Sequence, residues 1–112
     1  QRVRGQILGG TVQGLGYAMM EELVHKNGYV VNPNLKDYYI PTSLDIPENI
    51  QTFIIEKAGS IGPYGAKIVA EPPIVLPAPA VRNALLNAVG SGVNSLPITS
   101  EKVLNAIKSS RK

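Results

Sequence analysis

One carboxylate stands in a run of apolar residues. Glu71 follows Ile68-Val69-Ala70 and precedes Pro72-Pro73 and Ile74-Val75-Leu76. The proline at position 72 favours extended backbone at Glu71, which would restrict where its side chain can point. Burying a carboxylate among apolar groups costs free energy unless another group binds it or its function requires it there. Two interpretations fit: a carboxylate that interacts with a helix N-terminus, or a general base in a water-poor pocket.

A glycine-rich stretch is the second candidate for chemistry. Gly9-Gly10-Thr11-Val12-Gln13-Gly14-Leu15-Gly16 combines helix-like apolar spacing with four glycines. The glycines could allow close packing against another backbone, or leave free N–H groups for a phosphate or carbonyl group. Gln13 is then either a surface amide or a group that both donates and accepts hydrogen bonds to a heterocycle. No buried parallel strand leads into the stretch, so it matches neither a P-loop nor a dinucleotide fingerprint.

The remaining polar motifs are weaker. Gly62-Pro63-Tyr64-Gly65-Ala66-Lys67 is either an ordinary turn or a backbone-lined wall beside a ligand. His25 is the only histidine and has no second ligand at metal spacing, so we expect no protein-ligated metal. No Ser/His/Asp arrangement is present, and without cysteine the chain has no thiolate site.

Composition limits the class of protein. The 112 residues are 44% hydrophobic and 17% charged, which is typical of a globular chain able to form one modest core. The net charge is +3, but much of the excess lies at the two ends, and no basic run alternates with aromatic residues as in a nucleic-acid surface. No apolar stretch approaches the ~20 residues of a membrane span, no signal peptide is visible, and the absence of cysteine suits the cytoplasm.

The elements that must position these residues follow from apolar spacing and turn signals. We expect a helix over Leu8–Val24, a tight turn at Asn27-Gly28, and strands at three places: Tyr29–Val31, Tyr38–Ile40 and Thr52–Glu56. A second helix should follow Pro72-Pro73, with Pro77 and Pro79 disturbing its early turns and Gly90 ending it. A third, short helix should begin with Thr99 as its N-cap. The predicted fold class is α+β: a two-layer arrangement of a small, mainly antiparallel sheet with two substantial helices and one short C-terminal helix.

Seven segments in order resemble the molybdenum hydroxylase family, the group of the xanthine dehydrogenases, aldehyde oxidoreductases and aerobic carbon monoxide dehydrogenases. The similarity covers nearly the whole chain, and the matching segments are Gly9–Glu22, Asn32–Tyr38, Ile40–Thr42, Asp45–Pro47, Gly62–Lys67, Glu71–Pro73 and Leu96–Thr99. The chain also begins with Gln1 rather than Met. We therefore expect residues 1–112 to be a single-domain, C-terminal fragment of the molybdopterin-binding region of the large subunit.

The resemblance implies a function and a set of site residues. It implies hydroxylation of an electron-poor carbon with oxygen taken from water, with Glu71 as the catalytic base. Gln13 matches the glutamine whose side chain hydrogen-bonds the molybdopterin cofactor in relatives. The expected cofactor-binding residues are Gln13, Gly14, Gly65, Ala66 and Lys67. The implied partners are the rest of the large subunit and subunits or domains that carry 2Fe-2S clusters and FAD, with a small-molecule substrate and an oligomeric assembly. Purines, aldehydes, N-heterocycles and carbon monoxide are all compatible substrates, and the fragment alone is expected to be inactive.

Two residues depart from the family pattern. Relatives usually have glycine before the Glu-Pro-Pro motif where this chain has Ile68 and Ala70. The added side chains could narrow the pocket or tilt Glu71. They motivate an alternative, a non-catalytic structural or assembly module derived from this family. A third hypothesis, an anion-binding module that uses the basic ends, predicts salt-sensitive binding to nucleic acid.

Overall fold

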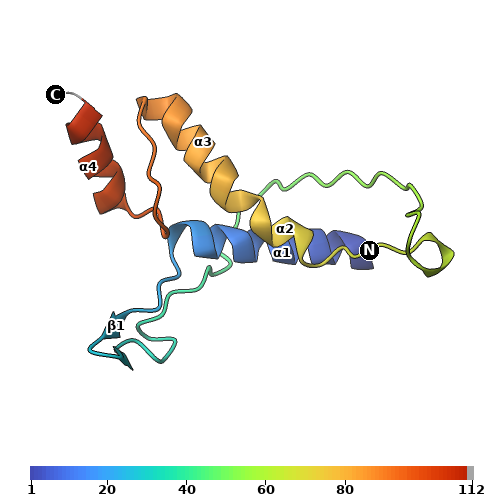
Figure 1. The fold of residues 1–112 in the computed structure, drawn as a ribbon, viewed down its shortest axis with the longest axis horizontal. Helices are drawn as coiled ribbons and strands as arrows, with labels where there is room; N and C mark the ends of the chain where they lie inside the picture. Colours follow the sequence, from blue (N-terminus) through green and yellow to red (C-terminus); the bar gives the residue numbers. More distant parts are fainter. Residues whose placement is uncertain (111–112) are drawn as a thin grey trace.

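A computed structural model describes residues 1–110, and its longest element is α1, Arg2–Met19 (Figure 1). The helix begins and ends earlier than the predicted Leu8–Val24. At its C-terminus the carbonyl of Gly16 accepts hydrogen bonds from the N–H groups of both Met20 and Glu21, each at 2.8 Å. Met20 has left the helical region, with φ −131° and ψ −44°. The apolar residues after Met20 therefore continue the hydrophobic pattern but not the helix.

A small hairpin follows α1. Strands β1, His25–Lys26, and β2, Tyr29–Val30, pair antiparallel with His25 opposite Val30 and Lys26 opposite Tyr29. Asn27 and Gly28 have φ values of 51° and 83°. Positive φ at both central residues is the type I′ geometry, which matches the twist of a two-residue hairpin. The predicted turn at Asn27-Gly28 is confirmed.

The strands predicted at Tyr38–Ile40 and Thr52–Glu56 are wrong, because neither segment pairs with another strand. The first closes a turn, in which the N–H of Tyr38 donates to the carbonyl of Asn34 at 2.9 Å. The second is extended but unpaired, and Figure 1 shows it (green) running apart from the helices. Within residues 1–110 the α+β fold therefore has a sheet of only two strands.

Helices α2, Pro72–Val75, and α3, Pro77–Val89, form one nearly continuous helical path across α1 (Figure 1). Leu76 between them keeps helical backbone, with φ −79° and ψ −34°. Pro77 and Pro79 have no N–H to donate to the preceding turn, and this interrupts the path as predicted. Gly90 ends α3 with φ 71°, and its N–H donates to the carbonyl of Leu86 at 2.9 Å. The predicted stop at Gly90 is confirmed.

Two glycines of α1 allow α2 and α3 to approach closely. A Cβ added to Gly10 would lie 2.8 Å from Cβ of Pro73 and 3.0 Å from the carbonyl oxygen of Ala70. A Cβ added to Gly14 would lie 2.5 Å from the carbonyl oxygen of Ile74 and 2.6 Å from Cγ of Pro77. No side chain fits at either position, so these glycines serve close backbone packing, the first of the two interpretations above.

The C-terminal part returns to the end of α1. The N–H of Ile98 donates to the carbonyl of Ala18 at 2.7 Å, which fixes the segment before helix α4, Ser100–Ser110. The hydroxyl of Thr99 accepts from the N–H of Lys102 at 3.3 Å, so Thr99 is the N-cap as predicted. A single 3-10 turn, η1 (Pro63–Gly65), lies in the long connection before α2.

The described residues form very little core. The buried hydrophobic side chains are Ala18, Val93 and Ile98, and no large side chain is fully buried. The radius of gyration is 17.4 Å, against about 13 Å for a compact domain of this length. The predicted modest core is therefore not formed by this chain alone. Among the helices described, none is long and apolar enough to cross a bilayer.

Candidate functional site

An open groove of about 600 Å³ lies between the C-terminal half of α1 and the α2–α3 path. We call it the carboxylate groove, because two of the residues that line it are glutamates. Its lining residues are Gly14, Tyr17, Glu21, Glu22, Leu23, Ile74, Val75, Ala78, Leu96 and Pro97.

Glu71 is the residue that immediately precedes α2. Its backbone is helical, with φ −76° and ψ −38°, so the extended conformation predicted from Pro72 is wrong. Pro72 and Pro73 have no N–H groups, the N–H of Ile74 donates to the carbonyl of Glu71 at 3.0 Å, and no side-chain cap hydrogen bond forms. The helix-terminus interpretation therefore fails. The side chain is exposed, and the described residues do not by themselves enclose it in a dry pocket.

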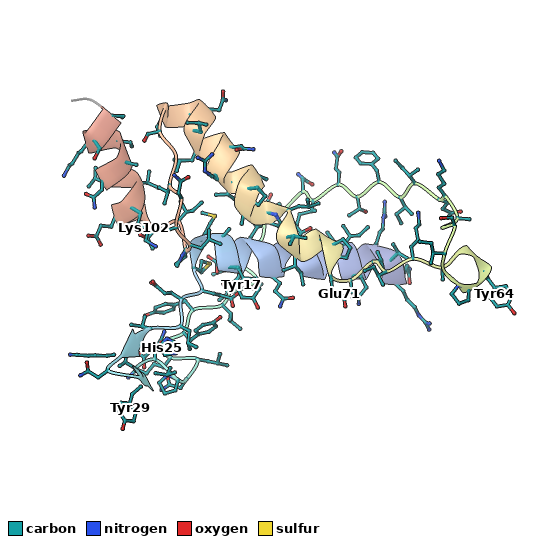
Figure 2. All side chains as sticks on the ribbon, in the orientation of Figure 1. Tyr17, His25, Tyr29, Tyr64, Glu71 and Lys102 are labelled. Atoms are coloured by element: carbon teal, nitrogen blue, oxygen red, sulfur yellow. The ribbon has the colours of Figure 1, made fainter. Side chains whose placement is uncertain are left out.

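Glu71 belongs to the same side of the α2–α3 path as the carboxylate groove. Val75 is one helical turn after Glu71, and Val75 and Ala78 both line the groove. Tyr17, on α1, lines the groove from the other side. Figure 2 shows Glu71 and Tyr17 projecting along the same edge of the α1–α2 pair.

Gln13 lies one turn before Tyr17 on α1. Its side chain is exposed, and its Nε2 donates to the hydroxyl of Tyr17 at 3.5 Å, a long hydrogen bond. Gly9 lies a further turn back, and nothing comes within 4 Å of a Cβ added there. The row Gly9–Gln13–Tyr17 thus presents an amide, a phenol and a bare stretch of helix to the outside. Sequence analysis missed Tyr17, although its spacing of four from Gln13 was a usable signal.

Of the other predicted cofactor-binding residues, Gly65, Ala66 and Lys67 do not join Gln13 and Glu71, whereas Gly14 follows Gln13 and lines the carboxylate groove. Gly14 is buried beneath α2 and α3, and packing accounts for it. Gly65, with φ 78°, belongs to a hydrogen-bonded turn in which its carbonyl accepts from the N–H of Gly59 at 2.9 Å. Ala66 and Lys67 follow it as exposed residues. Figure 2 places Tyr64 of this turn at the far end of the molecule from Tyr17, with Glu71 between them.

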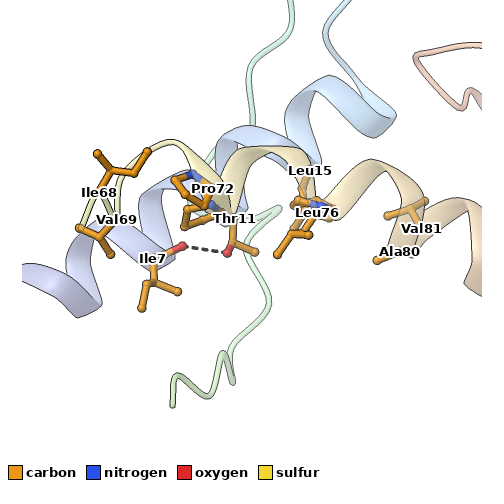
Figure 3. A pocket seen from close by; sticks show the side chains of 11 residues that line it. Ile7, Thr11, Leu15, Ile68, Val69, Pro72, Leu76, Ala80 and Val81 are labelled. Carbon is orange, nitrogen blue, oxygen red and sulfur yellow. Dashed lines mark hydrogen bonds between the residues drawn. The ribbon is translucent and has the colours of Figure 1, made fainter. Parts of the chain in front are cut away.

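A second groove, of about 490 Å³, lies on the other side of the α1–α2 contact (Figure 3). We call it the apolar groove. Its one polar lining residue is Thr11, whose hydroxyl donates to the carbonyl of Ile7 at 2.8 Å. Ile68 lines this groove and not the carboxylate groove. The Ile68 side chain therefore does not reach the groove that Tyr17 lines.

The loop after α1 is held by a buried amide and a carboxylate. Asn32 is only 8% exposed; its Oδ1 accepts from the N–H of Val24 at 2.8 Å, and its Nδ2 donates to the carbonyl of Glu22 at 2.7 Å. The hydroxyl of Tyr38 donates to Oε2 of Glu21 at 2.7 Å, and this hydrogen bond is the main cause that raises the pKa of Tyr38 to about 12. These contacts fix the two glutamates at the mouth of the carboxylate groove.

The chemistry of the row suits a polar heterocyclic cofactor bound from outside the chain. An exposed amide, an open helix surface at Gly9 and a carboxylate without a capping partner lie on one side of the molecule. The part of the chain that the structure describes has no cluster of three His, Cys, Asp or Glu side chains able to hold a metal ion. A metal at this site would have to be held by the cofactor itself, and the residues present fit such a group.

Comparisons with known proteins identify relatives of this chain. Residues 1–47 match the molybdopterin cofactor-binding domain family. The chain is 41% identical over 101 residues to a putative xanthine dehydrogenase molybdenum-binding subunit of Escherichia coli (strain K12). The matched region covers 88% of this chain and 13% of that protein.

Two solved structures share the fold of this chain. Quinoline 2-oxidoreductase from Pseudomonas putida 86 matches with a TM-score of 0.83 and 33% identity, over 95% of this chain and 14% of that one. A Cu,Mo-CO dehydrogenase matches with a TM-score of 0.81 and 25% identity, over 96% and 14%. The chain thus spans about one seventh of the length of the proteins it matches. From the shared sequence and the shared fold, the chain belongs to the molybdenum hydroxylase family and corresponds to part of its molybdopterin-binding large subunit.

Proposed function

We propose that this chain supplies one wall of the cofactor site of a molybdenum-dependent hydroxylase. The observation that carries the proposal is the exposure of Gln13 and Glu71 on the same side of the α1–α2 pair, where neither is used by the chain's own packing. If the side chains of Gln13 and Glu71 were buried in contacts within the chain, those contacts would explain both residues without a cofactor. A polar edge left open at a close helix contact instead suits a site completed by other protein.

Each residue has a chemical task in this proposal. Gln13 binds the pterin through its amide, which can donate and accept at once. Gly9 leaves room for the flat ring system to approach the helix. Tyr17 accepts from Nε2 of Gln13 and so orients the amide, which leaves Oε1 of Gln13 available as an acceptor. The bound cofactor would supply the redox-active metal that receives electrons from the substrate.

Glu71 would act as the general base. It would take a proton from the water-derived oxygen group that is transferred to the substrate, at its carboxylate oxygen. The rest of the subunit would have to cover this carboxylate, because a base is effective near neutral pH only when partial desolvation raises its proton affinity. The relatives fall into classes with different substrates, and the pocket that selects among purines, aldehydes, N-heterocycles and carbon monoxide would lie mainly outside this chain.

The partners follow from the same proposal. The rest of the large subunit would complete the cofactor site, and subunits or domains with 2Fe-2S clusters and FAD would carry electrons away, in an oligomeric cytoplasmic complex. The chain alone would be inactive, because one wall holds neither cofactor nor substrate.

Metal analysis of the complete large subunit tests the proposal. We expect stoichiometric molybdenum and pterin in the wild type, and a loss of bound pterin in Gln13→Ala, because the amide contact is removed. Asn34→Ala, which removes an exposed amide from the loop after the hairpin, serves as the control and should keep its cofactor.

The alternative is a structural or assembly module, favoured by Ile68 and Ala70 in place of the family's glycines. It predicts a complete protein without stoichiometric molybdenum. That result would remove the proposed cofactor role, whereas molybdenum lost selectively in Gln13→Ala would remove the alternative.

A further inference from the structure

The segment from residue 50 to residue 57, which we call the open strand, has the pattern of a β-strand without a partner. Exposure alternates from residue 50 to residue 55: Ile50 and Thr52 are half-buried and Ile54 is 48% exposed, whereas Phe53 and Ile55 are 81% and 88% exposed. A period of two is the side-chain repeat of a strand with one covered face. Residues 50–53 line a cavity of about 380 Å³ together with Arg4 and Leu8, so the segment begins against the start of α1.

The backbone of this segment is also unpaired. Within the described part of the chain, no backbone-to-backbone hydrogen bond involves residues 46–58. Figure 1 shows the segment as an open arc that no other ribbon accompanies. Phe53, Ile54 and Ile55 are the residue types enriched in strands, and an edge that carries them is a template for pairing with another chain segment.

We propose that the open strand is one strand of a β-sheet whose other strands come from the rest of the large subunit. The proposal rests on the proposed function, in which this chain is one part of a longer cofactor-binding subunit. Pairing would satisfy the free N–H and C=O groups, and the incoming layer would bury Phe53 and Ile55.

The rest of the subunit is a better occupant than a second copy of this chain. The chain matches only 13% of its relative's length, so most of the subunit's length is available to supply strands. Exposed large hydrophobic side chains are also spread over the hairpin, the 59–65 turn and the helices, for example Tyr29, Ile61 and Val75. One symmetric contact between two copies covers one patch, whereas these side chains need cover on several sides.

Hydrogen–deuterium exchange of the complete large subunit tests the proposal directly. We expect the amides of residues 51–57 to exchange at least ~100-fold more slowly than those of an unstructured peptide, because they donate to neighbouring strands. Exchange at the unstructured rate would overturn the proposal. Protection that disappears on dilution would also overturn it, since a second copy would then be the partner.

A pair of substitutions gives an independent test in the same protein. Phe53→Ala removes the exposed ring, and Phe53→Pro removes the ring and the backbone donor. The proposal predicts that Phe53→Pro lowers the yield of soluble subunit at least several-fold more than Phe53→Ala does. Ser60→Pro and Ser60→Ala, in the neighbouring turn, should give equal yields. Equal yields for the two Phe53 variants would contradict strand pairing.

These measurements do not depend on turnover or on metal. If Gln13 and Glu71 have no role in catalysis, the exchange protection of residues 51–57 is unaffected. If the open strand exchanges freely, the tests of Gln13 and Glu71 keep their meaning.

Discussion

Asn32 shows how one buried amide can organise a surface loop. Its side chain is buried while its neighbours on the loop are exposed. It accepts from the N–H of Val24, eight residues earlier, and donates to the carbonyl of Glu22, ten residues earlier. A third, longer contact runs from Nδ2 to the carbonyl of Asp37 at 3.5 Å. The residue fixes the path of the chain from α1 into the hairpin.

We predict that Asn32→Ala destabilises the complete subunit by ~1–3 kcal/mol, because buried backbone groups lose their partners. The measurement is the urea midpoint of the cofactor-free subunit. Asn34→Ala is the matched control, since the side chain of Asn34 accepts only the exposed N–H of Lys36 at 3.1 Å. Equal shifts for the two variants would contradict the role assigned to Asn32.

The pair of Tyr38 and Glu21 gives a prediction on pH. The hydrogen bond to Glu21 favours the neutral phenol, and the folded pKa of Tyr38 is about 12 against an ordinary 10.0. Between pH 10 and pH 12 the phenol of Tyr38 loses its proton in the unfolded chain but keeps it in the folded one. The stability that the Tyr38–Glu21 hydrogen bond contributes is therefore complete below pH 10 and is lost as the pH rises towards 12.

The measurement is the ultraviolet titration of tyrosinate, taken as the difference between the complete large subunit and its Tyr38→Phe variant. Glu21→Gln should lower the pKa of Tyr38 towards its ordinary value. A difference titration that does not respond to Glu21→Gln would show that the hydrogen bond is not the cause.

At the scale of residues, the important polar side chains could be predicted from the sequence, but their backbone conformation and burial could not. The position of Glu71 before a proline pair is visible in the sequence, but its helical backbone is not, because packing of α2 on α1 overrides the local preference before proline. The Asn32-Pro33-Asn34 segment could be recognised as a loop. Nothing in its composition shows which of the two asparagines is buried.

At the scale of elements, four of the five glycines of α1 divide into two groups, and the fifth, Gly16, faces Pro41. Gly10 and Gly14 face α2 and α3 and have no room for a side chain, whereas Gly5 and Gly9 face open space. A helix with small residues on one side and an exposed amide on the other can pack closely and still present a binding edge. The division explains why close packing and cofactor contact can both apply to one glycine-rich motif.

We predict different consequences for the two groups in the complete subunit. Gly14→Ala should lower the stability of the cofactor-free protein by ~1–3 kcal/mol, because an added Cβ overpacks the contact with Ile74 and Pro77. Gly9→Ala should leave that stability within ~1 kcal/mol, since Ala is the better helix former, but should reduce bound pterin. Tm and pterin content are the measurements, and equal losses of both in the two variants would contradict the division.

Local signals predicted the turns and caps well, but not the sheet. Asn27-Gly28, Gly90 and Thr99 act through their own backbone or hydroxyl groups, so a sequence window contains the whole cause. Thr52–Glu56 has strand composition, but pairing requires a second strand that the window cannot contain. The predicted end of the first helix at Val24 was wrong for a related reason. Apolar residues after Met20 continue the helical spacing, although the backbone leaves the helix there.

The whole molecule lacks the interior of an independent domain. Among residues 1–110 only Ala18, Val93 and Ile98 form a buried hydrophobic core, while large side chains such as Leu44, Ile55 and Ile61 are almost fully exposed. An extended shape of 54 × 36 × 30 Å fits a piece that wraps other protein better than one that encloses its own core. The sequence could not reveal this, because a hydrophobic fraction of 44% is the same whether the core lies within the chain or against a partner.

We predict that the chain produced alone binds a hydrophobic dye strongly and self-associates, because its apolar surface is not covered. Dye fluorescence and sedimentation measure the two properties. The complete large subunit is the control and should show neither. A monomeric chain without dye binding and with one sharp unfolding transition would contradict this view of the molecule.

The central claim is that Glu71 is the base of a cofactor site completed by the rest of the subunit. Turnover of the complete enzyme carrying Glu71→Gln tests it most directly, with Glu101→Gln on α4 as the matched control. We predict that Glu71→Gln lowers kcat by on the order of 10²-fold while molybdenum remains bound, the scale of a lost general base, and that Glu101→Gln changes neither. Unchanged turnover in Glu71→Gln with the metal in place would contradict the account.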